Sequence, residues 1–138
     1  MEIKTSIETQ GPLFKHSANN VLRSAYQTGI QELVERGEDF LNKKASFRPQ
    51  GEYLSPSMGG KSTGHYRRSI STQVKNLEGV IHDGGVVYGP WLEGKSSRNQ
   101  TTRFKGYAMF RQTEQFLEKK FKEVMEKHTA KAVRRLGK

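Results

Sequence analysis

The stretch ISTQVKNLEGVIHDGGVVY, residues 70–88, decides the fold class of this chain. Polar and apolar residues alternate over residues 70–74, and the turn-forming residues 76–79 and 83–85 separate this run from two further short apolar runs. Alternation with a period of two is typical of half-buried strands, and Asn and Gly between such runs are typical of tight turns. The stretch therefore predicts an antiparallel meander of three short strands, the last at residues 86–88.

Helical patterns flank this meander on both sides. Apolar residues fall on one stripe, at about 100° per residue, from about residue 13 to residue 41 and again over residues 107–136. The segment EIKTSIE at residues 2–8 alternates like a half-buried strand. The sequence therefore predicts an α+β fold, in which a long N-terminal helix and a long C-terminal helix pack on a small, mainly antiparallel sheet.

The length of the chain favours a single domain over residues 1–138. Only 33% of the residues are hydrophobic, which predicts a thin core and some dependence on neighbouring subunits for stability. Residues 42–64 contain two prolines, several glycines and serines, and little periodicity. A long flexible loop is therefore expected there.

The sequence lacks the marks of several protein classes. It contains no cysteine, which excludes disulfides, thiolate metal sites and thiol nucleophiles. No run of 18 apolar residues occurs, so a membrane-spanning helix is not expected. Charged, alternating residues follow Met1 in place of an apolar stretch, so no secretion signal is expected.

Motifs for catalysis are weak. Residues 59–63, GGKST, resemble the end of a phosphate-binding loop, but Ser55 stands where that pattern needs glycine. The pair His82 and Asp83 has no identifiable nucleophile partner, and Glu93 is a single acid without a second carboxylate to complete an acid/base pair. We therefore expect no catalytic residue and no cofactor site, and predict that the chain is not an enzyme.

The histidines do not indicate a metal site. No HExxH spacing and no close carboxylate pair at helical spacing occurs at any of the four: His16, His65, His82 and His128. His128 lies on the apolar stripe of the last helix, which favours a hydrogen-bonded histidine in the core or at an interface.

Positive charge is concentrated in the last third of the chain. Residues 1–94 hold eleven basic and ten acidic residues, whereas residues 95–138 hold thirteen and four. Such a block favours contact with nucleic acid or with an acidic protein surface, and the alternative is a solvated face that serves solubility. The predicted basic partner surface consists of Arg111, Lys119, Lys120 and Lys122.

An aromatic segment precedes this basic third. Residues 88–94, YGPWLEG, carry the only tryptophan and a proline that cannot continue a central strand. Clustered aromatic residues suit a subunit contact, and the alternative is that they cap the core beneath the last helix. The predicted subunit interface consists of Tyr88, Pro90, Trp91, Leu92 and Glu93, with Ile30 and Val34 from the first helix.

These residues resemble a known family. Residues 88–94, with SRN at 97–99 and TRFKGY at 102–107, are similar to small neck and tail-completion proteins of long-tailed bacteriophages. Members of this family, tail terminators and head-tail connectors, carry a signature of the type Tyr-x-x-(Trp/Tyr)-(Leu/Val)-Glu-x-Gly. The residues that match it are Tyr88, Trp91, Leu92, Glu93 and Gly94, the glycine here directly following the glutamate.

The resemblance implies a structural virion protein with an α+β fold. It implies a homo-oligomeric ring at the junction of head and tail, a hexamer if the chain is the tail terminator. The implied partners are other neck and tail proteins, and the implied location is the neck of the virion, with the host cytoplasm during assembly. Contact with DNA without sequence readout is compatible with this role, because the genome passes through the neck.

The main alternative is a basic nucleic-acid-binding module that uses the last helix. Against it, the basic residues are not part of a helix-turn-helix or a zinc site, and no aromatic stacking platform is interleaved with them. A closed ring, a dimer and a monomer would each favour a different function.

Overall fold

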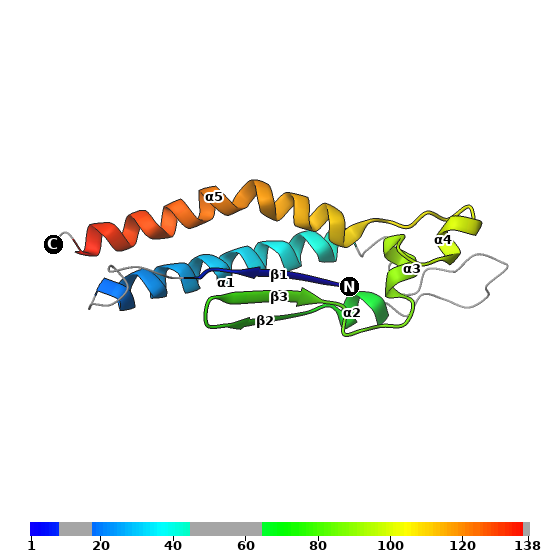
Figure 1. Ribbon diagram of the computed structural model, residues 1–138, viewed down its shortest axis with the longest axis horizontal. Coiled ribbons are helices and arrows are strands. Elements are labelled where there is room, and N and C mark those ends of the chain that lie inside the picture. Colours follow the sequence, from blue (N-terminus) through cyan, green and yellow to red (C-terminus); the bar gives the residue numbers. More distant parts are fainter. Residues whose placement is uncertain (9–17, 45–64, 137–138) are drawn as a thin grey trace.

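The computed structural model describes residues 1–8, 18–44 and 65–136 and has the predicted α+β fold (Figure 1). In chain order its elements are β1 (Glu2–Ser6), α1 (Ala18–Lys44), α2 (His65–Ser69), β2 (Ser71–Lys75), β3 (Glu78–His82), α3 (Gly89–Glu93), α4 (Arg98–Thr101) and α5 (Met109–Leu136). The two long helices and the strand at the N-terminus are confirmed.

The predicted boundaries differ from the observed ones at several points. Residues 42–44 of the expected loop belong to α1, and residues 45–64 lie outside the described residues, as do residues 13–17 at the expected start of the first helix. The short helices α2, α3 and α4 were not expected from the sequence. None of the helices in the described ranges has a stretch long and apolar enough to span a lipid bilayer.

The sheet has the strand order β1-β3-β2, and both pairings are antiparallel. Gly79 of β3 lies opposite Thr5 of β1 and opposite Val74 of β2. The predicted strand at residues 86–88 is wrong. Gly84 and Gly85 adopt φ angles of 72° and 74° and turn the chain away from the sheet, and Pro90 then stands in the first turn of α3. The third strand of the sheet is β1.

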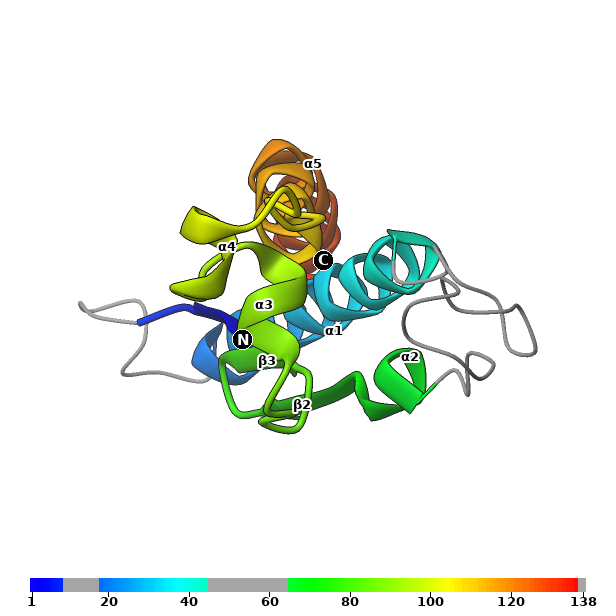
Figure 2. The same cartoon turned by 90° about the vertical axis from the view of Figure 1, so that its right-hand side faces the viewer.

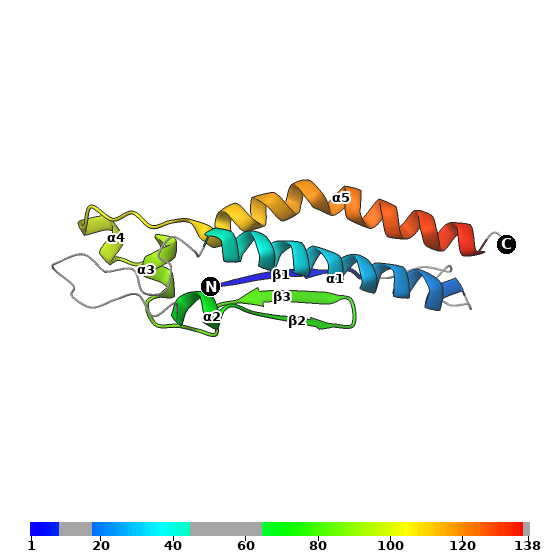
Figure 3. The same ribbon diagram turned by 180° about the vertical axis from the view of Figure 1, so that it is seen from behind.

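The elements form three layers. Figures 1 and 3 show α1 between the sheet and α5, with the two long helices side by side along most of their length. The end view in Figure 2 places α5 over α1, with β2 and β3 on the opposite side of α1. Because α1 is covered on two sides, its apolar surface is wider than one sheet face requires.

Ile30 and Val34 of α1 face the sheet inside the subunit. Their exposed fractions are 0% and 2%. A Cβ at position 79 would lie 2.5 Å from Val34 Cγ2 and 2.9 Å from Ile30 Cγ2, so glycine at this position lets α1 approach β3 closely. The prediction that Ile30 contacts a neighbouring subunit is therefore wrong, because the sheet already covers it, whereas Val34 packs on the sheet and also lines the groove between β1 and α5.

Leu33, one residue away from Val34, packs on the other helix instead. It forms a second buried cluster with Val124 and Met125 of α5. The residues of the main core are contributed by every layer: Ile30, Val34, Leu41, Tyr66, Ile70, Leu77, Ile81, Leu92, Met109 and Phe110.

A charged clasp joins α1 to α5. The Glu32 carboxylate accepts hydrogen bonds from Lys127 Nζ at 2.7 Å and from Arg36 at 2.8 Å, and it contacts His128 Nε2 at 2.5 Å. The bond from Lys127, followed by the one to His128, lowers the pKa of Glu32 from its ordinary 4.5 to about 2. The prediction of a hydrogen-bonded role for His128 is confirmed, with its partner on the neighbouring helix.

Candidate functional site

Residues 83–111 join the sheet to α5 and hold the aromatic segment that the sequence singled out. Their starting point is Asp83, which is 0% exposed. Its carboxylate accepts hydrogen bonds from the Tyr66 hydroxyl at 3.1 Å, the Gly85 N–H at 3.0 Å and the amino group of Met1 at 3.2 Å. Burial, and then the negative charge of Asp83, raise the pKa of Tyr66, so its hydroxyl stays protonated and donates.

The start of α3 lies directly against this carboxylate. A side chain at Gly89 would collide with Asp83 Oδ2, so only glycine fits there. Tyr88, the residue before it, is 42% exposed, and its ring centroid lies 5.9 Å from that of Tyr66. Partial burial raises the pKa of Tyr88. Tyr88 is thus held at the surface by a buried tyrosine beneath it.

Glu93, at the end of α3, caps the beginning of α5. Its Oε2 accepts the N–H of Phe110 and its Oε1 accepts the N–H of Arg111, each at 2.9 Å. The first N–H groups of a helix have no partner within the helix, and a carboxylate there is also favoured by the helix dipole. The prediction that Glu93 lies in the subunit interface is wrong, because the side chain is 5% exposed and faces the interior.

Two glycines let the chain cross itself next to this cap. Gly94 and Gly106 adopt φ angles of 99° and 93°, and a Cβ on either one would collide with the backbone of the other segment. The N–H of Tyr107 donates to the carbonyl of Leu92 at 2.7 Å across the crossing. The residues on the two sides of α4 are therefore fixed to each other.

Asn99 of α4 braces the loop enclosed by this crossing. It is 3% exposed, its Oδ1 accepts the Ser96 N–H at 2.9 Å, and its Nδ2 donates to the carbonyls of Trp91 and Phe104 at 3.0 and 3.1 Å. Lys105 Nζ also donates to the Asn99 carbonyl at 2.8 Å. This role of Asn99 was not predicted from the sequence, although an Asn among Ser and Gly residues commonly organises a turn.

Trp91 belongs partly to the core. It is half-buried, packs against the main core cluster, and its ring lies 4.5 Å from Phe104, which in turn lies 5.0 Å from Tyr107. Leu92 is 8% exposed and faces the interior, so its predicted place in the interface is also wrong. The core-capping alternative thus holds for Leu92 and, in part, for Trp91.

The residues that this framework presents to solvent are Val87, Tyr88 and Pro90, here called the α3 patch. Val87 is 95% exposed, the highest value among the large hydrophobic residues that are exposed in the described chain. Pro90 is half-buried. Val87 was missed as a site residue, because a strand at 86–88 would have been expected to pair with the sheet.

The basic residues divide into two groups. On α5, Lys120 and Lys122 lie 3.7 Å and 3.9 Å from Glu123 and Glu126, so acidic neighbours partly neutralise them. Arg111 and Lys119, the other two residues of the predicted basic surface, are exposed and form no ion pair among the described residues. Around α4, no acidic residue occurs from residue 94 to residue 113, and Lys95, Arg98 and Arg103 are exposed. We call these three residues the basic corner.

The remaining candidates from the sequence do not form a reactive cluster. His82 Nδ1 accepts the Gly84 N–H at 3.0 Å. The Asp83 carboxylate already accepts hydrogen bonds from Tyr66, Gly85 and Met1. Within residues 1–8, 18–44 and 65–136, no three His, Asp or Glu side chains gather as metal ligands would. The glycine-rich residues 59–63 and His16 lie outside the described residues.

Known proteins were compared with the chain at three levels. No family model, no curated protein and no solved structure matches it. What the chain does is therefore inferred below from its described residues and from the resemblance noted for residues 88–107.

Proposed function

We propose that the chain is a structural subunit of the bacteriophage neck, a tail terminator or tail-completion protein that forms a ring joining tail to head. The observation that carries this proposal is how residues 83–111 are built. Buried polar groups, Asp83, Glu93 and Asn99, fix the backbone, and the same segment presents Val87 and Tyr88 to solvent.

A fixed apolar patch supports a protein contact on physical grounds. An exposed Val beside a half-exposed Tyr and a Pro offers apolar area that water solvates poorly, and a rigid backbone loses little conformational entropy when a partner binds. Tyrosine is also enriched among the residues that contribute most to binding energy. The residues that match the family signature thus fall into two groups. Some, such as Glu93, are buried and hold the backbone in place, and others, such as Tyr88, are exposed.

The test of this proposal is the native mass of the purified chain, followed by a joining assay. A ring, a hexamer if the chain is the terminator, should appear in native mass spectrometry and persist on dilution into the micromolar range. Adding the protein to separated heads and tails that lack it should then yield joined particles in electron micrographs. A monomer at every concentration, with no joined particles, would contradict the proposal.

The basic corner favours a second candidate function, contact with nucleic acid. Lys95, Arg98 and Arg103 are each exposed, and no acidic residue occurs within the surrounding segment 94–113. Phosphate contacts of this kind bind without sequence preference and weaken steeply with salt. Binding of random-sequence duplex DNA, measured over a salt series, tests this candidate, and a sequence preference or a flat salt response would contradict it.

A further inference from the structure

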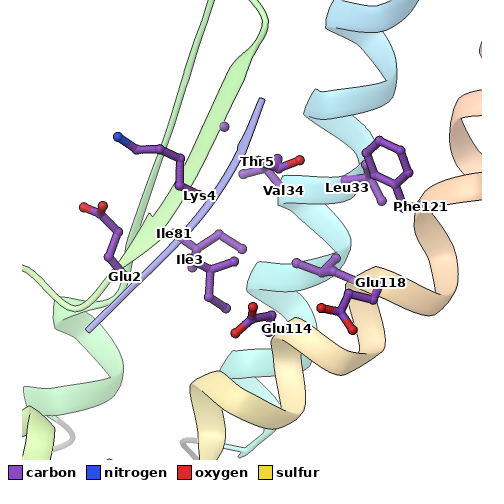
Figure 4. A pocket seen from close by; sticks show the side chains of 12 residues that line it. Glu2, Ile3, Lys4, Thr5, Leu33, Val34, Ile81, Glu114, Glu118 and Phe121 are labelled. Atoms are coloured by element: carbon purple, nitrogen blue, oxygen red, sulfur yellow. The ribbon is translucent and has the colours of Figure 1, made fainter. Parts of the chain in front are cut away.

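A groove of about 350 Å³ lies between β1 and α5 (Figure 4). Its apolar lining comes from all three layers: Ile3, Leu33, Val34, Ile81, Leu117 and Phe121. Phe121 is 38% exposed although it lies beside the buried Leu33. Figure 4 shows Glu114 and Glu118 pointing from α5 toward the groove, whereas Glu2 and Lys4, which also line it, extend their side chains away from α5. The groove is therefore apolar inside and acidic along its α5 rim.

The two rim carboxylates are unusual in this chain. The formal net charge is +10, yet Glu114 and Glu118 form no ion pair with any described residue. By contrast Glu123 and Glu126, on the same helix, lie next to Lys120 and Lys122. Like charges one helical turn apart repel each other slightly. A basic partner would remove that repulsion.

The end of α5 is apolar and basic, and so complements the apolar, acidic groove. Val133 and Leu136 are 56% and 43% exposed, and their spacing of three residues places them on neighbouring positions of one helix face. The basic residues around them are Lys131, Arg134 and Arg135, and no acidic residue follows Glu126 in the chain. An exposed pair of apolar side chains flanked by positive charge matches an apolar groove with a negative rim.

We infer that the groove binds the last turns of α5, residues 131–136, from a second copy of this chain. The mode is that of an amphipathic helix in a groove, with Val133 and Leu136 as anchors and Arg134 or Arg135 near Glu114 and Glu118. This inference rests on the proposed ring, because it names the contact between ring subunits.

The chain cannot fill its own groove. Leu136 follows Glu118 by 18 residues of one continuous helix, and a rise of about 1.5 Å per residue separates them by about 27 Å. The helix end and the groove are also different surfaces, so each copy donates one and receives the other. Such head-to-tail contacts close into rings when the rotation between copies permits it.

A charge exchange tests the inference. The variant E114K/E118K has a basic groove and a basic helix end, and the variant R134E/R135E has an acidic groove and an acidic helix end. Each variant alone should assemble about 100-fold more weakly than the wild type, because like charges then meet at every contact. Mixed in equal amounts, the two variants should form rings of alternating copies, since each groove then meets a helix end of opposite charge.

The matched control is E123K/E126K, which makes the same change of charge on the same helix but away from the groove. It should assemble like the wild type in native mass spectrometry. A wild type that forms rings, with E114K/E118K assembling equally well or with no ring in the mixture, would overturn the inference and leave the proposed function standing. A wild type that stays monomeric would overturn both.

Cross-linking gives a second measurement that does not depend on charge. Because the chain contains no cysteine, every disulfide in the double variant L136C/F121C joins introduced positions, and the single variants L136C and F121C report any bond between two equal positions. Mild oxidation of the ring should give a ladder of covalent oligomers on a non-reducing gel. The control L136C with K119C, on the opposite side of α5, should give none. Equal ladders in both variants, or an absent ladder in the first, would contradict a helix end in the groove.

Discussion

The carboxylate of Glu93 accepts the backbone N–H of Phe110 at 2.9 Å, across seventeen residues of sequence. This bond ties the end of α3 to the beginning of α5, and its twin to Arg111 satisfies a second N–H group of the same helix. One side chain thus orients both the segment that presents the α3 patch and the helix that carries the rim of the β1–α5 groove.

Removing the Glu93 cap should loosen this joint. E93A leaves two helix N–H groups without their partners in a buried place, and we expect the free energy of unfolding to fall by about 2–3 kcal/mol. E93Q keeps one carbonyl acceptor and should lose less. Urea unfolding at one fixed protein concentration measures both. An E93A protein as stable as the wild type would show that the cap contributes nothing.

Residues Trp91 and Val87 should respond differently to substitution. W91A removes a ring that packs on the core and on Phe104, and should cost about 3 kcal/mol of folding stability. V87D changes an exposed side chain, so the fold should remain while a charge in the α3 patch weakens assembly by about 2 kcal/mol or more. Thermal melting and native mass spectrometry separate the two effects. Assembly of V87D at wild-type concentrations would remove the α3 patch from the interface.

The clasp at Glu32 predicts a dependence of stability on pH. The folded chain lowers the pKa of Glu32 from 4.5 to about 2, so its contribution is complete above about pH 4.5 and is lost as the pH falls toward 2. E32Q removes this titration. The unfolding free energy of the wild type should therefore fall more steeply than that of E32Q between those two values, as measured by urea unfolding in a pH series. Parallel curves would show that the clasp is not made in solution.

The basic corner and α5 can be compared in DNA binding. Changing Lys95, Arg98 and Arg103 together to Gln should reduce the salt slope of DNA binding by about 2–3 units, one for each lost phosphate contact. The control is the same change at Lys119, Lys120 and Lys122, of which two lie beside glutamates. Its effect should be smaller, and both triple variants should fold like the wild type, because exposed charges contribute little to stability. Equal slopes in both variants would place the contact elsewhere.

Periodicity predicted the long elements well, because α1, α5 and the β2–β3 hairpin each follow from a local pattern. It was wrong at two places. Residues 86–88 have the composition of a strand, but Gly84 and Gly85 turn the chain away from the sheet, and α3 follows at Gly89. Ile30 and Val34 widened the apolar surface of α1 beyond what one sheet face would cover. The sequence does not show that a sheet and a second helix cover α1 on two sides.

The candidate site was predicted in place but not in detail. The aromatic segment was located from its composition, yet the roles of its residues depend on partners far along the chain. Glu93 meets Phe110 and Asp83 meets Tyr66, each seventeen residues away, and no local spacing rule connects either pair. Asn99 could have been found from its turn-like neighbours, whereas the exposure of Val87 depends on the turn at Gly84 and Gly85.

During synthesis, β1 leaves the ribosome long before the strand with which it pairs. β1 ends at Ser6, but its partner β3 begins only at Glu78. At the usual 5–20 residues per second, a ribosome needs about 4–14 seconds to make the chain between them. During that interval the strand has no native neighbour, and its alternating charges, Glu2 and Lys4, discourage pairing with strands of other chains. The hairpin of β2 and β3 needs no such delay, so the sheet is completed by the strand that was made earliest.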